Sequence, residues 1–244
     1  MLKAAIQYLV GLKENKTYDI NGETYSDHEL VRIAPHVDRP REIQVNGLSS
    51  IAALVREEIF AFKDRVQLPI YIRIIDAREV AVFTSYDDMM ARDALYRCSC
   101  DAPSFRPGWM EHDEAVIKLR SIFVQDGDIS DLEYVMDLLS RVSKESSVTS
   151  SDNGISQTVE ARQGVALSQR VKVRPIVRLT PYRTFLEVEQ PTSEFLLRLD
   201  GEGRVGLLEA DGGRWKMDAK QYISEFFHRE LKNLIDSRDV VILA

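Results

Sequence analysis

Residues 171–191, VKVRPIVRLTPYRTFLEVEQP, carry cationic side chains at alternate positions, and carboxylates follow at a similar spacing. Alternate side chains of a β-strand leave opposite faces, so the cations share one face and the valines share the other. Guanidinium groups suit the oxygens of phosphate and carboxylate. The pattern predicts an anion-facing surface made of Arg170, Lys172, Arg174, Arg178 and Arg183. Tyr182 and Trp215 are candidates for stacking against a bound base.

A solvated sheet face has the same pattern. Glu187 and Glu189 continue the alternation in a further predicted strand at 183–189. Carboxylates on a neighbouring strand would pair with the cations and neutralise them. The residues alone therefore leave two interpretations open, an anion site and a paired solvent face.

A second kind of chemistry would need only carboxylates. Asp126, Asp128 and Asp211 could hold Mg²⁺, which prefers oxygen ligands and leaves no His or Cys signature. Each of these aspartates also stands beside glycine, a composition typical of turns. We assign no catalytic residue and no cofactor from the sequence.

Histidine and cysteine give little support for a metal site. The four histidines are scattered, without the i, i+4 pair of a helical zinc site. Cys98 and Cys100 lie two apart in a predicted strand, where a mutual disulfide is geometrically poor. They are expected to be buried thiols in a reducing cytosol.

Composition limits the class of protein. The 244 residues are 44% apolar and 29% charged, which is typical of a globular protein of one large or two small domains. The 32 Lys and Arg against 39 Asp and Glu give a net charge of −7, which opposes indiscriminate binding to phosphate backbones. The N-terminus reads poorly as a signal peptide, and no apolar run is long enough for a membrane span.

Periodicity and turn residues predict the elements that would position these side chains. Helices are expected in an opening segment and at about 49–65, 111–125, 130–144 and 217–235. Strands are expected in a 17–25 hairpin around Asn21-Gly22 and at 69–76, 79–87, 93–100, 165–179, 183–189, 194–200 and 204–209. The β-branched run at 239–244 should either join a sheet edge in the same subunit or pair with a neighbour.

These elements predict an α+β fold with two antiparallel β-meanders, each covered by helices. The helices at 111–125 and 130–144 should cover the first meander, and the helix at 217–235 should cover the second. The expected domains are an N-terminal helix and hairpin (1–45), an α+β domain (46–145), a linker or long loop (146–164), and a β-meander with a C-terminal helix and terminal strand (165–244).

The wording and order of LTPYRTFLEVEQPTSEFLLRL and EADGGRWKMDA resemble the YfdQ-like group, an uncharacterised family of tailed-phage and prophage proteins. The resemblance covers roughly residues 45–235 and includes APSFRPGW at 102–109 and DNGISQ at 152–157. It implies a non-virion protein made in the cytosol of a bacterial host, from genomes rich in replication, recombination and host-takeover genes. The family has no established catalytic residues to carry over.

We therefore expect a phage or prophage accessory protein that acts by binding nucleic acid, a nucleotide or a host factor. It would serve replication, recombination, host takeover or anti-defence, as a homo-oligomer and without a membrane partner. One alternative is a Mg²⁺-dependent enzyme acting on a nucleotide or phosphodiester. Another is a purely structural, self-assembling protein.

Overall fold

The computed structural model describes residues 16–26, 39–125, 130–141, 147–152, 157–163 and 166–244. For 147–152, 157–163 and 166–172 it describes the backbone and not the side chains. The chain forms two compact units, Met1–Arg39 and Pro40–Ala244. The α+β fold class is confirmed, and no helix in the described residues is long and apolar enough to span a membrane.

The first unit contains a β-hairpin of β1 (Thr17–Ile20) and β2 (Glu23–Ser26). Asn21 and Gly22 connect the strands with φ angles of 55° and 81°. Positive φ at both positions is what a type I′ turn requires, and Asn-Gly is its preferred pair. This confirms the predicted hairpin; the predicted opening helix lies outside the described residues.

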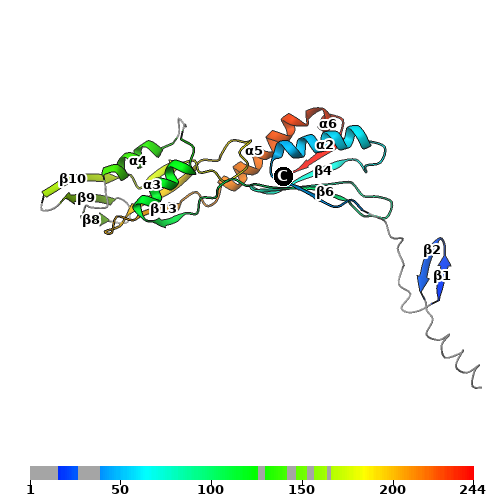
Figure 1. Ribbon diagram of the computed structural model, residues 1–244, viewed down its shortest axis with the longest axis horizontal. Helices are drawn as coiled ribbons and strands as arrows, with labels where there is room; N and C mark the ends of the chain where they lie inside the picture. Colours follow the sequence, from blue (N-terminus) through cyan, green and yellow to red (C-terminus); the bar gives the residue numbers. More distant parts are fainter. Residues whose placement is uncertain (1–15, 27–38, 126–129, 142–146, 153–156, 164–165) are drawn as a thin grey trace, which may run out of the picture. The chain divides into compact units, whose positions relative to one another are not determined.

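One sheet of the second unit has the order β14-β4-β5-β6-β3 (Figure 1). Its centre is the predicted antiparallel meander of β4 (Ile70–Asp76), β5 (Glu79–Phe83) and β6 (Ala94–Ser99). Both edge strands are parallel to their neighbours: β3 (Ile43–Val45) to β6, and β14 (Val240–Leu243) to β4. The terminal apolar run therefore joins a sheet within its own subunit.

The other helix-covered sheet is antiparallel and has the order β11-β12-β13-β7. It contains β11 (Ile176–Leu179), β12 (Ser193–Leu199), β13 (Val205–Glu209) and β7 (Gly108–Met110). The strand predicted at 183–189 is wrong, because those residues form a loop. The strand predicted at about 165–179 is divided at Arg174 and Pro175, where the chain passes from one sheet to another.

The stretch predicted as a linker or long loop contains strands instead. β8 (Ser147–Asp152) pairs with β9 (Gln157–Gln163), and β9 pairs with β10 (Ala166–Val173), in a three-stranded antiparallel sheet. The many Ser and Thr residues of 146–164 suggested a loop, but pairing between strands outweighs such local preferences.

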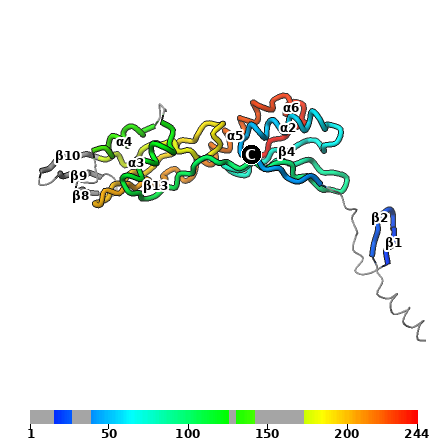
Figure 2. The backbone as a smooth tube through the Cα atoms, viewed as in Figure 1, coloured from blue at the N-terminus to red at the C-terminus, as the bar shows by residue number. Residues whose placement is uncertain are grey.

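The helices cover the opposite sheets from those predicted. α2 (Leu48–Phe62), α5 (Trp215–Glu230) and α6 (Lys232–Asp236) pack on the sheet that contains β4. α3 (His112–Ser121) and α4 (Leu132–Arg141) pack on the sheet that contains β12. Figure 2 shows the C-terminal part of the chain returning to lie beside α2 and β4.

Because the helices pack on the sheets in this way, the described residues form two buried cores. Ile223 and Phe227 of α5 join Ile72 of β4 in one core, whereas Leu119 and Leu138 join the second sheet in the other. The first core is thus assembled from both ends of the 40–244 unit. The predicted boundaries at 46–145 and 165–244 divide this core and need correction.

The loop at 180–192 is organised by one amide side chain. Gln190 Oε1 accepts hydrogen bonds from the backbone N–H groups of Arg183 (2.9 Å) and Thr184 (3.2 Å). Gln190 Nε2 donates to the carbonyl of Phe185 (2.9 Å), whose ring is buried in the first core. Because Gln190 satisfies these backbone groups, the segment needs no strand partner.

The same loop also reaches α2. Glu187 Oε1 accepts a hydrogen bond from the backbone N–H of Ser49 (3.0 Å), in the first turn of α2. The N-cap of α2 is Gly47, without a side-chain cap. A carboxylate at a helix N-terminus is stabilising, so Glu187 replaces the missing cap of α2.

Candidate binding groove

The predicted anion-facing arginines at 174–178 lie on an exposed face, but each has a carboxylate beside it. Arg174 Nη1 lies 3.2 Å from Asp131 Oδ1, and its guanidinium stacks 4.3 Å from the centroid of the Tyr134 ring. Arg178 Nε lies 3.6 Å from Glu194 Oε1 on the neighbouring strand. This arrangement has the geometry of a paired solvent face.

Arg183 is not on a surface, because only 3% of it is exposed. Its Nη1 donates to Glu209 Oε1 (2.7 Å) and to Ser193 Oγ (3.0 Å). Its guanidinium lies 4.7 Å from the Trp215 ring centroid, so that ring already stacks on a side chain of its own molecule. Burial lowers the pKa of Arg183, and the adjacent Glu209 opposes that change. The predicted stacking residue Trp215, which is half-buried, therefore contacts the buried Arg183 within the same molecule.

The remaining predicted site residues are Arg170, Lys172 and Tyr182. Arg170 and Lys172 lie in β10 opposite Glu160 and Thr158 of β9, and their side chains are outside the description. Tyr182 is half-buried, and its backbone N–H donates to the carbonyl of Ile122. The structure therefore unites Arg183 with Trp215 but does not form one surface from the predicted set.

The expected carboxylate partners also differ from those observed. Glu187 and Glu189 are exposed in the 180–192 loop rather than in a paired strand. The observed partners are Asp131, Glu194 and Glu209, and Asp131 also accepts a hydrogen bond from the backbone N–H of Arg178 (2.8 Å). The interpretation as a paired solvent face named Glu187 and Glu189 as the partners, and the observed partners are different residues.

The magnesium hypothesis receives no geometric support from the described residues. Asp126 and Asp128 lie outside them. Asp211 Oδ1 accepts a hydrogen bond from the backbone N–H of Gly213 (2.9 Å), as in a turn. Within the described part of the chain, no group of three or more His, Cys, Asp or Glu residues could hold a metal ion.

One glycine motif has the wrong structural context for a cofactor. Residues 201–206, GEGRVG, have the spacing of a dinucleotide-binding loop, which requires a strand followed by a helix. Here the motif connects β12 to the antiparallel β13, with Gly203 at φ 80°. It is a hairpin connection.

The two cysteines behave as predicted for packed thiols. Cys98 is buried, Cys100 is half-buried, and both are free. Burial raises the pKa of the Cys98 thiol to about 12, with nearby acidic groups adding to the effect. A thiol with this pKa is a poor nucleophile at neutral pH.

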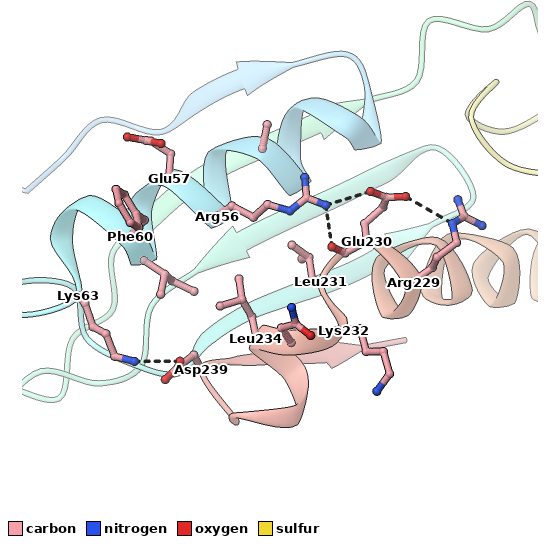
Figure 3. Close-up of a pocket in the computed structure, with 13 residues that line it drawn as sticks. Arg56, Glu57, Phe60, Lys63, Arg229, Glu230, Leu231, Lys232, Leu234 and Asp239 are labelled. Carbon is pink, nitrogen blue, oxygen red and sulfur yellow. Dashed lines mark hydrogen bonds and ion pairs between the residues drawn. The ribbon is translucent and has the colours of Figure 1, made fainter.

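A groove with a volume of about 910 Å³ lies between α2 and the α5–α6 segment (Figure 3). We call it the α2/α6 groove. It is lined by Ala53, Arg56, Glu57, Ile59, Phe60, Lys63, Arg229, Glu230, Leu231, Lys232, Asn233, Leu234 and Asp239. Ile59, Leu231 and Leu234 give it an apolar floor, and Phe60 stands beside them with 87% of its surface exposed.

Ion pairs hold the two walls of the groove together. Arg56 Nη2 donates to the carbonyl of Glu230 (2.6 Å) and to its Oε2 (2.9 Å), as Figure 3 shows. Lys63 Nζ lies 3.1 Å from Asp239 Oδ2 at the other end. Hydrogen bonds from Arg56 and Arg229 lower the pKa of Glu230, and those from Ser237 and Lys63 lower the pKa of Asp239.

The arrangement suits recognition of a protein segment. Its charges are mutually paired, so they supply no strong field for a polyanion, whereas the ring of Phe60 remains exposed beside the buried Ile59 and Leu231. Apolar grooves between helices commonly accept side chains of a partner protein. Sequence reasoning missed this site, although one signal existed: Phe60 falls off the apolar spacing of its helix, on the polar side.

Comparisons with known proteins do not identify the chain. No family model, curated protein or solved structure matches it. The resemblance to the YfdQ-like phage group stays a prediction.

Proposed function

We propose that this protein is a phage or prophage accessory protein that acts by binding another protein segment through the α2/α6 groove. The observation that carries the proposal is Phe60, 87% exposed beside the buried Ile59 and Leu231 of the groove floor. An exposed aromatic side chain beside an apolar groove is a typical anchor of a protein interface.

The charges favour a protein ligand over a nucleic acid or nucleotide. Binding to a phosphate backbone needs cations that are free to replace counterions. Arg174, Arg178 and Arg183 each have a carboxylate partner, and so do Arg56 and Lys63 at the groove. A segment with apolar side chains needs no such free charge.

Site-specific photo-crosslinking in infected cells tests the proposal. A photoreactive residue in place of Phe60 should give discrete crosslinked protein products. A matched probe in place of Ile117, which is 65% exposed on α3, should not give the same products. For any product found, Phe60→Ser should weaken binding of the purified partner at least tenfold, and Ile117→Ser should leave it unchanged.

The competing prediction of anion binding is tested in parallel. Arg174→Glu with Arg178→Glu should leave binding to nucleotides and single-stranded DNA unchanged in a low-salt titration. If positions 60 and 117 gave identical crosslinks, the groove would not be a specific binding site. If the charge-reversed variant also lost DNA binding, the arginines would be the better candidate for the site.

A further inference from the structure

Arg183, Ser193, Glu209 and Trp215 form what we call the Arg183 cluster, and two of its donor groups are unsatisfied. Arg183 Nη1 donates to Ser193 Oγ and Glu209 Oε1. Arg183 Nη2 and Trp215 Nε1 are also buried, but neither has a hydrogen-bond acceptor within the described part of the chain. Folded proteins satisfy nearly all of their buried polar groups, with protein atoms or with ordered water. These two donors therefore need acceptors that the described residues do not supply.

Packing holds both donors inside the protein. The Arg183 guanidinium carbon lies 4.7 Å from the ring centroid of Trp215 and 5.2 Å from that of Phe195, which is fully buried. The backbone N–H of Arg183 donates to Gln190, and Trp215 is the first residue of the 16-residue helix α5. Because both residues are held in this way, their donors are fixed in place before any ligand binds.

A cavity of about 430 Å³ adjoins the Arg183 cluster. Ser193, whose Oγ accepts from Arg183 Nη1, lines this cavity. Arg214, the residue before Trp215, lines it too, as does Asp218, about one helical turn after Trp215. The cavity is large enough for a small organic molecule or for water. Its wall is thus made partly of residues that are bonded or adjacent in sequence to the two donor residues.

The charges around the cavity favour an uncharged acceptor. Its charged lining consists of two arginines and three carboxylates: Arg178, Arg214, Glu194, Asp211 and Asp218. The buried positive charge of Arg183 is offset by Glu209, 2.7 Å away. An anionic ligand would add to the excess of carboxylates, whereas a neutral carbonyl oxygen accepts hydrogen bonds without adding charge. An amide also has N–H groups, which carboxylates accept.

We propose that this cavity binds a small uncharged amide, whose carbonyl oxygen accepts hydrogen bonds from Arg183 Nη2 and Trp215 Nε1. The amide N–H groups donate to a carboxylate of the lining, such as Asp218. In the absence of the amide, water supplies the acceptor oxygen. The cavity shares no lining residue with the α2/α6 groove, so this inference goes beyond the proposed function and does not depend on it.

NMR of the full chain tests the proposal, because the chain has two tryptophans and each gives one indole N–H signal. Benzamide is the probe, and benzoate, which has nearly the same shape but carries a charge, is its matched comparison. Benzamide should shift the Trp215 signal in a saturable way and leave unmoved the signal of Trp109, which is 49% exposed and outside the cavity lining. Benzoate should bind at least tenfold more weakly. Before benzamide is added, the Trp215 N–H should receive magnetisation from a bound water.

A pair of variants separates hydrogen bonding from packing. Trp215→Phe keeps an aromatic ring that can stack on Arg183 but removes the N–H donor, so it should weaken benzamide binding at least tenfold in calorimetry. Trp109→Phe is the matched control and should leave that binding unchanged. If Trp215→Phe failed to fold, the titration of the unmodified chain would still decide the question.

Three results would overturn the inference. They are a Trp215 signal that benzamide does not move, benzoate binding as tight as that of benzamide, or benzamide binding that Trp215→Phe leaves unchanged. The first result would mean that water alone satisfies the two donors. None of these measurements involves Phe60, so discrete crosslinks from that position would support the proposed function even if this inference failed.

Discussion

The exposed arginines Arg174 and Arg178 and the α2/α6 groove both carry ion pairs, but they differ in what lies beside the charges. Below Arg174 and Arg178 the side chains of Val173, Val177 and Leu179 are buried in a closed core. Around the groove, the pairs made by Arg56 and Lys63 stand beside Phe60, whose side chain is 87% exposed. The exposed aromatic ring of Phe60, rather than the row of paired cations, therefore marks the better candidate for binding.

The largest expected effect is on the free energy of unfolding, and it distinguishes an arginine that stabilises the fold from one that binds a ligand. Arg183→Ala should lower the free energy of unfolding by about 2–4 kcal/mol, because it removes a buried hydrogen-bonded pair. Urea denaturation measures the change. Arg174→Ala, whose side chain is 60% exposed, should cost less than about 1 kcal/mol. An Arg183→Ala protein of normal stability with lost nucleotide affinity would restore the arginine surface as the site.

The next effect concerns the groove. Phe60→Ser should change the free energy of unfolding by less than about 0.5 kcal/mol, since the side chain is exposed. It should weaken docking at least tenfold, or about 1.4 kcal/mol, because the ring would be buried by a partner. Calorimetric or sedimentation titration measures docking. If the free energies of unfolding and of docking fell by equal amounts, Phe60 would have only a structural role.

A smaller effect concerns the carboxylate at the start of α2. Glu187→Ala should cost about 1 kcal/mol of stability by removing the bond to the Ser49 N–H. Gly47→Ala should have a similar cost, because its Cβ would lie 2.9 Å from Glu187 Oε1 and displace that side chain. Thermal unfolding of both single variants and the double variant checks this. Additive losses would mean that the two residues act independently.

The smallest effect is in the pH dependence of the groove. The folded-state pKa values of Glu230 and Asp239 are lowered, so their stabilising contribution is complete above the ordinary carboxyl pKa, about 4, and is lost as the pH falls below it. Both groups are largely open to water, so the change in stability should be small. Chemical denaturation between neutral and acidic pH should show it, and Glu230→Gln with Asp239→Asn should remove part of the slope.

Local features of the fold were predictable from the sequence. Asn21-Gly22 indicated its hairpin, and β-branched alternation indicated β4, β5 and β6. The helices that cover each sheet were not predictable, because periodicity identifies an apolar face and not the sheet that it meets. α5 has the same kind of apolar face as α3 and α4, and only packing assigns it to β4.

The candidate site was less accessible to sequence reasoning. Alternation correctly predicted that Arg174 and Arg178 leave the core face. The carboxylate beside Arg174 is Asp131, more than forty positions away in the chain, and the carboxylate beside Arg178 is Glu194 on the neighbouring strand. The strand expected at 183–189 failed because Gln190 satisfies the backbone there, an interaction that no propensity encodes. The groove needs α2 beside α6, and these helices are far apart in sequence.

The parallel pairing of β14 with β4 has a consequence for the order of folding during synthesis. When β4, β5 and β6 leave the ribosome, their covering helix α5 and edge strand β14 have not yet been made. At about 5–20 residues per second, the residues from 100 to 243 take roughly 7–30 s to translate. The core formed by α3, α4 and β11 to β13 is complete sooner, so the middle of the chain can fold while the earlier sheet still waits for its last strand.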